Sequence, residues 1–390
     1  MPSGPVRTMR VLHVAETIRG GIATYLNELH PHQRKSLGAG NVHYVIPSGH
    51  RADLVGIDDA EITEFSRSDR GISGLFRMLF ATLRAVHRLQ PDVVHLHSSF
   101  AGLVLRPVLL LKRKGPRIVY CPHGWAFSRE TGRLSHQVTK LVEGVLAKIT
   151  DRIICISRDE YKEGIRAGIE ADRLVLVHNG ISKNRPLPDT VSAIWPSEKT
   201  KVLFIGRLDR QKGYDLLTEA ARALEDAVDV RIVGASVIGK YKDEGRALPS
   251  NVSLLGWQDR HQIEAQLEKA DLVVIPSRWE AFGLVALEAM RAAKPIIAFR
   301  IGALPEIVED GVTGVLCEPV SAAQLVEGFR RALKLDLPEV GLRGYERFRQ
   351  LYDIEKTHRV LNQVYVDLGR GDQIGSKQQA ELQSDLPNNF

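Results

Sequence analysis

The chain has 390 residues, of which 44% are hydrophobic and 26% are charged, and this length and composition indicate two α/β domains rather than one compact core. No run reaches the ~18 apolar residues that span a bilayer, since the most apolar stretch, 101–111, already contains Arg106. The cysteines, Cys121, Cys155 and Cys317, form no ligand pattern, so we expect buried, reduced thiols and a cytoplasmic protein.

The net charge of +6 is unevenly distributed. Residues 1–185 hold 27 Lys and Arg and 17 Asp and Glu, a balance of +10, which leaves −4 for the rest of the chain. The first half therefore favours an anionic partner. Aromatic residues make up only 6% of the chain and no basic helix carries interleaved stacking residues, so we expect no nucleic acid and favour an anionic membrane surface.

The first half alternates short β-branched runs with helical segments. Strands are predicted at 10–15, 42–46, 93–97, 118–121, 153–156 and 174–177. Helices are predicted at 22–30, 73–89, 100–112, 134–149 and 159–167. This alternation is typical of a parallel sheet covered on both faces, and we assign residues 1–183 to an acceptor-binding, Rossmann-like domain.

A proline-rich, polar linker at 184–200 separates this domain from a second α/β series at 201–345. Its strands are predicted at 202–205, 230–233, 252–255, 272–275, 296–299 and 314–317. Its helices are predicted at 214–224, 261–269, 284–293 and 322–334. Residues 339–368 are expected to form one long helix whose part at 346–368 returns to the first domain, followed by a disordered tail at 369–390.

Two loops of the second half carry the residue types that bind a diphosphate. Ligands lie outside the carboxyl ends of the strands in open parallel sheets. The strand at 202–205 is followed by Gly206 and Arg207, and Lys212 stands where the next helix begins. Both cations can neutralise the charge of a diphosphate leaving group.

The segment after the strand at 272–275 supplies the other half of such a site. Phe282, Gly283 and Leu284 open a helix, where free N–H groups and the positive end of the helix dipole meet anions. Glu280 precedes this helix and Glu288 lies inside it, so one carboxylate can face a sugar while the other binds ribose hydroxyls. Each glutamate by itself is more often a solvated surface charge, and only the combination favours the site.

In the first half, Gly20 and Gly21 open the first helix, and a double glycine there can also be a simple tight turn. His123 follows the strand at 118–121 and is a candidate contact for a sugar or acceptor, although a lone histidine is more often structural. His95 and His97 raise the question of a metal site with His123, but no carboxylate partner is evident and we expect no metal.

Together these motifs resemble the retaining glycosyltransferases of family GT4, whose GT-B fold has two Rossmann-like parallel-sheet domains facing a central cleft. The resemblance runs in order from about residue 10 to residue 345. It rests on Gly20-Gly21, His123-Gly124, Asn179-Gly180, Gly206-Arg207-Leu208, Lys212-Gly213 and Glu280 with Glu288, and residues 276–289 are its most specific part.

The resemblance implies retaining transfer of a hexose from a UDP- or GDP-sugar, with no cofactor and no metal, and no Asp-x-Asp motif occurs in the sequence. It implies that Arg207 and Lys212 hold the diphosphate, with Glu288 on the ribose and Glu280 on the donor sugar. It implies further that Trp257 lies at the edge that binds the base and that the Gly20 loop approaches the donor across the cleft. Gly302-Ala303, where a glycine pair is common, and Ala293, where glycine is frequent, depart from the family pattern and weaken any assignment of the donor.

Two segments of the first half suggest membrane contact. Residues 75–88 place Leu75, Leu79 and Val86 on one side, and Lys112, Arg113 and Lys114 follow an apolar run. The alternative is that both segments are ordinary helices that cover the sheet and have solvated ends. Contact with anionic lipid predicts a peripheral enzyme at the inner face of the plasma membrane.

The acceptor expected from this polarity is a glycan or a polyprenyl-diphosphate-linked sugar in the synthesis of a bacterial surface polysaccharide or glycolipid. Two rival functions stay open. A sugar-nucleotide epimerase or hydrolase on the same fold would turn over the donor without any acceptor. A catalytically inactive nucleotide-sugar-binding protein would bind the donor without forming product.

Overall fold

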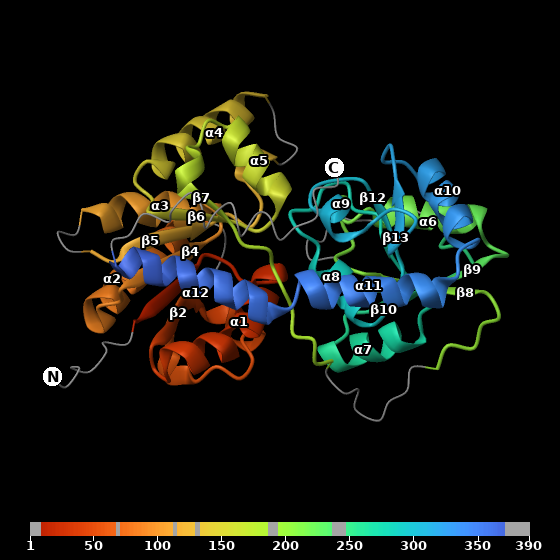
Figure 1. The fold of residues 1–390 in the computed structure, drawn as a ribbon, viewed down its shortest axis with the longest axis horizontal. Helices are drawn as coiled ribbons and strands as arrows, with labels where there is room; N and C mark the ends of the chain where they lie inside the picture. The colour runs from red at the N-terminus through yellow and green to blue at the C-terminus, as the bar shows by residue number, and fades with distance from the viewer. Residues whose placement is uncertain are drawn as a thin grey trace. The chain divides into compact units, whose positions relative to one another are not determined.

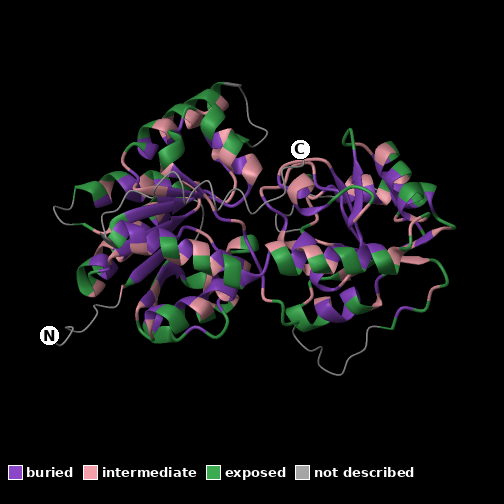
Figure 2. Cartoon of the chain, viewed as in Figure 1, coloured by how far each residue is buried: buried purple, intermediate pink, exposed green. Residues whose placement is uncertain are grey.

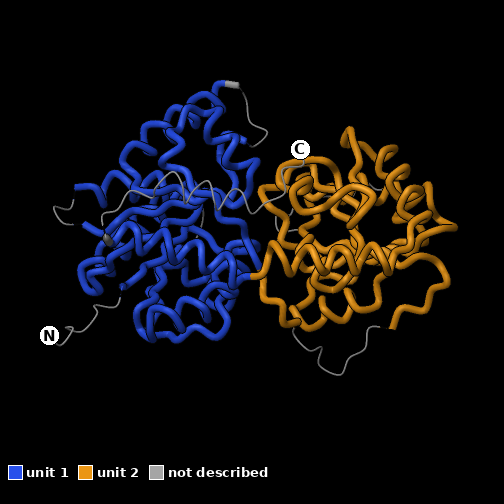
Figure 3. The backbone as a smooth tube through the Cα atoms, viewed as in Figure 1, with its two compact units in different colours: residues 1–180, 354–390 blue, residues 181–353 orange. Residues whose placement is uncertain are grey.

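The computed structural model describes residues 9–67, 71–111, 115–128, 133–185, 194–235 and 247–370. They belong to two compact units (Figure 3), unit 1 with residues 1–180 and 354–390 and unit 2 with residues 181–353. Each unit contains one parallel sheet with helices packed against it (Figure 1). Most of the predicted tail, 371–390, and part of the predicted linker, 186–193, lie outside the described residues.

Unit 1 is built on a seven-stranded sheet in the order β3-β2-β1-β4-β5-β6-β7. The strands are β1 Val11–Ala15, β2 Val42–Pro47, β3 Ile62–Phe65, β4 Val93–His97, β5 Arg117–Cys121, β6 Arg152–Cys155 and β7 Leu174–Leu176. The strand order reverses between β1 and β4, which is the position where doubly wound sheets bind ligands. Every residue of β1 and β4 is buried (Figure 2), as expected for central strands covered on both faces.

The helices of unit 1 lie near their predicted positions, although α1 continues to Leu37, past the end predicted at residue 30, and the last helix comes from the end of the chain. They are α1 Gly21–Leu37, α2 Ile72–Leu89, α3 Ser99–Leu110, α4 Arg133–Ala147, α5 Arg158–Arg166 and α12 Ile354–Arg370. Short 3₁₀ turns occur at Ser48–Asp53, Asp59–Glu61, Ala126–Ser128 and Ala171–Arg173. Helix α12 packs on α1, where Ser36 Oγ lies 3.0 Å from His358 Nε2.

Unit 2 repeats the same topology with a six-stranded sheet in the order β10-β9-β8-β11-β12-β13. The strands are β8 Thr200–Ile205, β9 Val228–Val233, β10 Val252–Gly256, β11 Leu272–Ile275, β12 Ile296–Phe299 and β13 Gly314–Cys317. The helices are α6 Tyr214–Ala223, α7 Arg260–Lys269, α8 Leu284–Arg291, α9 Leu304–Ile307, α10 Ala322–Ala332 and α11 Leu337–Leu351. Here the order reverses between β8 and β11.

The prediction of one continuous helix over 339–368 was wrong. Helix α11 ends at Leu351 and α12 begins at Ile354. Between them, the carbonyl of Tyr352 accepts a hydrogen bond of 3.1 Å from the N–H of Ile181, and Asp353 pairs with Ile181 in a parallel bridge. The Tyr352 hydroxyl also donates to the carbonyl of Glu306 at 2.7 Å. Tyr352 and Asp353 make these contacts and lie outside both helices. Helix α11 belongs to unit 2 and α12 to unit 1.

Candidate functional site

The two loops singled out in unit 2 leave neighbouring strands at the reversal point of the sheet. Residues 206–213 follow β8 and residues 276–283 follow β11, and β8 pairs directly with β11. Parallel pairing places both loops at the same edge. The predicted residues of these two loops therefore lie at one place in the fold.

Hydrogen bonds tie these two loops into one piece. The N–H of Arg278 donates to the carbonyl of Gln211 at 2.8 Å, and the guanidinium of Arg278 binds both carboxylate oxygens of Asp215 at 2.7 and 2.6 Å. Burial opposes ionisation of Asp215, but the hydrogen bonds and charge of Arg278 outweigh it and hold the pKa of this carboxyl below its ordinary value. This paired geometry fixes the loops before any ligand arrives.

Two glycines allow the loops to approach so closely. A Cβ on Gly213, at φ 69°, would lie 1.8 Å from the carbonyl oxygen of Pro276. A Cβ on Gly302, at φ 50°, would lie 1.9 Å from the carbonyl oxygen of Glu280. Both distances are far below van der Waals contact, so glycine is required at both positions. The glycine that remains of the usual pair thus supports the segment that carries Glu280.

Lys212 and Glu280 meet directly. Lys212 Nζ lies 2.5 Å from Glu280 Oε2, and Ser277 Oγ donates to the same carboxylate oxygen at 3.2 Å. The side chains are only 20% and 10% exposed. The family resemblance implied separate partners for these residues, the diphosphate and the sugar, and did not predict that they pair with each other. The pair holds a cation and an anion at one point of the sheet edge.

Arg207 has a different environment. Its Nη2 donates to Gln211 Oε1 at 2.6 Å and lies 3.1 Å from Asp209 Oδ2, and almost half of its side chain is exposed. These partners belong to its own loop, so the guanidinium lies at the surface beside Gly206. A partly exposed cation with polar partners can reorient toward an anion at small cost.

The start of α8 is the predicted anion-binding end. Gly283, which has no side chain, is its N-cap residue, and Leu284 is its first residue. Phe282 is buried, with its ring edge-on to Tyr352 at a centroid distance of 6.0 Å. Glu288 lies in the second turn of α8 and is partly buried.

Trp257 follows β10 and is 74% exposed. Its neighbour Gly256 accepts a hydrogen bond of 2.8 Å from the N–H of Gly234, which fixes the ends of β9 and β10 side by side. The indole therefore lies on the carboxyl edge of the sheet, at the outermost strand. A large exposed aromatic surface there is suited to stacking on a planar base.

The matching edge of unit 1 carries Gly20, Gly21 and His123. Gly20 is the N-cap residue of α1 and has no side-chain capping bond. His123 lies in the turn after β5 at φ 52°, an uncommon conformation for a residue with a side chain. The carboxylate of Glu160 holds this turn by accepting from the N–H groups of Gly124 and Ile156, each at 2.6 Å.

Three more histidines, His13, His95 and His97, lie next to His123. His13 Nδ1 lies 2.9 Å from His97 Nε2, and His97 Nδ1 lies 2.9 Å from His123 Nε2. His95 Nδ1 is 2.6 Å from the hydroxyl of Tyr365 on α12. Burial lowers the pKa of His13 to about 4 and of His123 to about 3, and it holds the pKa values of His95 and His97 well below their ordinary range. The four rings are therefore neutral at pH 7.

His13 was missed from the sequence. Its signal is the register of β1 and β4, which pairs His13 with His95. The metal-ligating group considered from the sequence combined His95 and His97 with His123. In the structure it is His13 that joins His95 and His97, with ligand atoms within 4.8 Å of one another.

The basic cluster Lys112, Arg113 and Lys114 lies outside the described residues. The helices before and after it carry exposed apolar side chains at helical spacing, which we name the apolar face. Its members are Ile72, Phe76 and Phe80 on α2, Phe100, Leu103, Leu110 and Leu111 on or next to α3, and Leu134, Val138, Leu141 and Val145 on α4. Helix α3 contacts both α2 and α4, so the three helices are neighbours.

The apolar face is not the side of α2 that the sequence singled out. Leu75 and Leu79 pack against the core of unit 1, and Val86 belongs to that core, so the sheet-covering alternative holds for that side. Exposed apolar residues in such number are typical of interaction surfaces. Among the described residues, no helix is both long and apolar enough to cross a membrane.

Comparison with known proteins covers both halves of the chain. A sequence model described as "Glycosyl transferases group 1" matches residues 190–347, and one described as "Glycosyltransferase Family 4" matches residues 19–185. A Klebsiella pneumoniae protein described as an uncharacterized 41.2 kDa protein in cps region is 34% identical over 328 residues, which cover 82% of this chain and 88% of the relative.

Solved structures share the fold at low sequence identity. Sucrose-phosphate synthase from Thermosynechococcus elongatus has a TM-score of 0.77 at 20% identity and covers 93% of this chain and all of its own. Anabaena HepE in complex with UDP-glucose has a TM-score of 0.73 at 20% identity, covering 91% of this chain and 99% of its own. The two parallel-sheet units thus have the GT-B architecture.

Proposed function

Because this chain belongs to the glycosyltransferases of family GT4, with the GT-B fold, we propose that it moves a hexose from a UDP- or GDP-sugar to an acceptor glycan or lipid-linked sugar with retention. The observation that carries this proposal is the Lys212–Glu280 pair between the ends of β8 and β11, next to the glycine at the start of α8. The cation and the helix start can bind the diphosphate that leaves, and the carboxylate can bind the sugar that is transferred.

The roles in donor binding follow the resemblance and the local geometry. Arg207 and Lys212 bind the diphosphate, and the N–H groups of residues 282–284 donate hydrogen bonds to the same anion at the start of α8. Glu280, freed from Lys212 by the incoming phosphate, binds the donor sugar. Glu288 binds the ribose. Anabaena HepE is described in complex with UDP-glucose, which supports a nucleotide-sugar donor.

Three further contacts complete the proposed set. Trp257 stacks on the base. Gly20 and Gly21 offer backbone N–H groups to the donor, and His123 contacts a sugar hydroxyl. Transfer then proceeds on one face of the sugar, as the positioned acceptor attacks while Arg207 and Lys212 stabilise the leaving diphosphate.

We also propose that no divalent metal takes part in transfer. Two cations at the edge of unit 2 supply the positive charge that a metal supplies elsewhere, and the sequence has no Asp-x-Asp motif. Electrostatic stabilisers of this kind contribute on the order of 10²-fold in rate each.

For the acceptor we propose a polyprenyl-diphosphate-linked sugar at the inner face of the plasma membrane. Three features of the first half of the chain support this choice: the balance of +10 in residues 1–185, the Lys112–Lys114 cluster, and the apolar face on α2, α3 and α4. Apolar side chains that enter the interface next to basic residues are typical of proteins that lie on anionic membranes. The Klebsiella relative, described by its cps region, supports a surface polysaccharide.

A donor screen followed by an acceptor assay tests the function. UDP-, GDP- and ADP-sugars are compared by thermal shift in EDTA, and the best donor is incubated with and without a lipid-linked acceptor. We expect stabilisation by one nucleotide class and a glycosylated product that requires the acceptor. Donor turnover without acceptor would favour the epimerase or hydrolase, and donor binding without any product would favour the inactive binding protein.

A further inference from the structure

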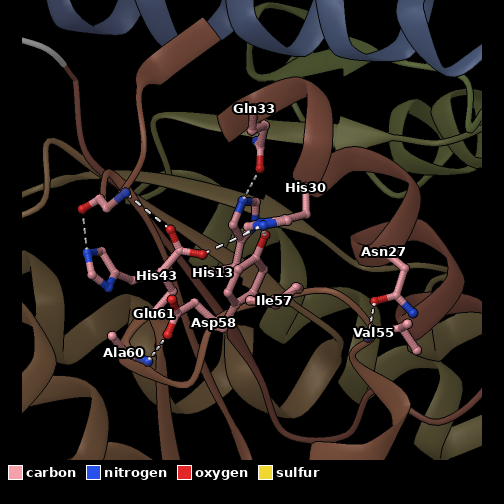
Figure 4. Close-up of polar contacts among 12 residues, drawn as sticks. His13, Asn27, His30, Gln33, His43, Val55, Ile57, Asp58, Ala60 and Glu61 are labelled. Atoms are coloured by element: carbon pink, nitrogen blue, oxygen red, sulfur yellow. Dashed lines mark hydrogen bonds and ion pairs between the residues drawn. The ribbon is translucent and has the colours of Figure 1, made fainter. Parts of the chain in front are cut away.

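A chain of hydrogen bonds runs through the core of unit 1 and ends at His123. Gln33 Oε1 on α1 lies 2.9 Å from His13 Nε2 on β1 (Figure 4). His13 Nδ1 lies 2.9 Å from His97 Nε2, and His97 Nδ1 lies 2.9 Å from His123 Nε2. Gln33, His13 and His97 are fully buried, so water does not interrupt the chain.

The chain has a direction because each neutral imidazole carries one proton. The amide oxygen of Gln33 only accepts, so His13 carries its proton on Nε2 and offers Nδ1 as an acceptor. His97 must then donate from Nε2 to His13 and accept at Nδ1. His123 in turn donates from Nε2, and its Nδ1 is left with a lone pair. Within the described residues, Nδ1 of His123 makes no hydrogen bond.

Packing keeps the rings in these orientations. The rings of His13 and His97 are stacked, with centroids 5.2 Å apart and planes 23° apart. The ring of His123 meets Tyr25 edge-on at 5.4 Å, and Glu160 holds the adjacent Gly124. With the ring planes fixed, the protons along the chain can rearrange only together.

We propose that Gln33, through His13 and His97, sets the tautomer of His123 so that its Nδ1 accepts a hydrogen bond from a sugar or acceptor hydroxyl. This rests on the proposed function, in which His123 contacts such a hydroxyl. Gln33, His13 and His97 are then positioning residues that act through His123. His95 stands outside the chain, because its Nδ1 pairs with Tyr365.

The test is ¹⁵N NMR of the full chain labelled at its 13 histidines, with His123 assigned from the spectrum of His123→Gln. We expect wild-type His123 to be protonated at Nε2 only. Gln33→Met removes the acceptor and keeps the length of the side chain, so the His123 signals should shift toward a mixture of both tautomers. His97→Asn should give the same mixture. Circular dichroism and thermal unfolding verify that each variant is folded.

His30→Gln is the matched control. His30 is buried on the same helix and bonds to the Tyr44 hydroxyl at 3.0 Å, outside the chain. We expect its exchange to leave the tautomer of His123 unchanged. In the transfer assay, Gln33→Met should lower kcat about tenfold, the effect of losing one hydrogen bond at the reacting groups, and leave the Kd of the free nucleotide unchanged.

Three results would overturn the proposal. One is a wild-type His123 protonated at Nδ1. Another is a His123 tautomer that stays pure in Gln33→Met. The third is purified protein that holds one equivalent of a transition metal on His13, His95 and His97, since a metal would replace the proton between His13 and His97. The tautomers are read without any activity assay, so a protein that transfers no sugar would contradict the proposed function and leave this test intact.

Discussion

The two units share one topology and differ in the chemistry at its reversal point. In both, the sheet order runs from its third strand through its second to its first and then continues with its fourth. At that point unit 2 holds charged pairs, Lys212 with Glu280 and Arg278 with Asp215. Unit 1 holds the neutral, buried rings of His13 and His97. The fold fixes where a ligand binds, and the side chains decide which ligand it is.

Each chemistry suits a different part of the proposed reaction. Charged groups that are partly exposed can exchange one ionic partner for another, as a diphosphate requires. Neutral histidines with fixed protons offer directional hydrogen bonds and suit hydroxyl groups. We therefore expect substitutions in unit 2 to change the nucleotide affinity and the rate of bond cleavage. We expect substitutions in unit 1 to change the protonation sites of the histidines and the affinity for the membrane.

The largest effect is expected from the cations of unit 2. Arg207→Ala or Lys212→Ala should lower the rate of transfer by ~10²-fold or more, because each removes an electrostatic stabiliser of the leaving diphosphate. Steady-state kinetics measure it. Lys269→Ala, which removes an exposed lysine at the end of α7, is the matched control and should leave the rate unchanged. Near-normal kinetics in both folded variants would show that these cations do not stabilise the leaving diphosphate.

Membrane binding should belong to unit 1. Replacing Lys112, Arg113 and Lys114 by Ser should weaken binding to anionic vesicles roughly a hundredfold, since each basic side chain contributes about 1 kcal/mol near such a surface. Added salt should weaken binding in the same way. Co-sedimentation measures both effects.

The apolar face provides a second variant for the same assay. Phe80→Ser should also weaken vesicle binding, because its exposed ring would lose its burial in the interface. Leu342→Ser exchanges an exposed apolar residue of unit 2 and should have no effect. If the wild type binds neither anionic nor neutral vesicles, the membrane role is contradicted.

The two glutamates of unit 2 should separate binding from turnover. Glu288→Ala should weaken binding of the free nucleotide at least tenfold, because the ribose hydroxyls lose a charged acceptor. Glu280→Ala should mainly lower kcat, because its partner is the reacting sugar. Calorimetry and kinetics measure the two effects. Unchanged nucleotide affinity in Glu288→Ala would show that the ribose role is wrong.

Acid should destabilise unit 1 first. Burial lowers the pKa of His13 from 6.5 to about 4, so the unfolded state binds more protons in this pH range. The free energy of unfolding therefore falls as the pH drops below 6.5, by about 1.4 kcal/mol per pH unit for this residue, until the pH reaches about 4. Unit 2 contains one histidine, His261. Hydrogen exchange at pH 5 should show earlier opening in unit 1 than in unit 2. Equal opening of the two units would contradict this expected difference in acid stability.

Much of the fold could be predicted from the sequence, because short β-branched runs indicate the strands of a parallel sheet. The residues that follow these runs indicate its carboxyl edge. Strand β3 was missed because its Thr63 and Glu64 break the apolar pattern at the sheet edge. The break at Tyr352 depends on contacts with Ile181 and Glu306, far away in the sequence. Such contacts leave no local signal.

The site shows the same division. Loop positions followed from motif spacing, whereas the Lys212–Glu280 contact and the link from His13 through His97 depend on how neighbouring strands align. The sequence indicated the wrong side of α2 for membrane contact because Leu75 and Phe76 are equally apolar, and only packing shows which of them meets the sheet. Periodicity identifies a helix more reliably than it identifies its buried face.

We expect unit 2 to bind a nucleoside diphosphate through its own cations, without metal. Hydrogen exchange with mass spectrometry in EDTA, with and without UDP or GDP, tests it most directly. We predict that one of the two nucleotides protects residues 206–213 and 280–288, and that Lys212→Ala loses this protection. Protection that appears only after addition of Mg²⁺ or Mn²⁺, or that falls outside both segments, would contradict the account.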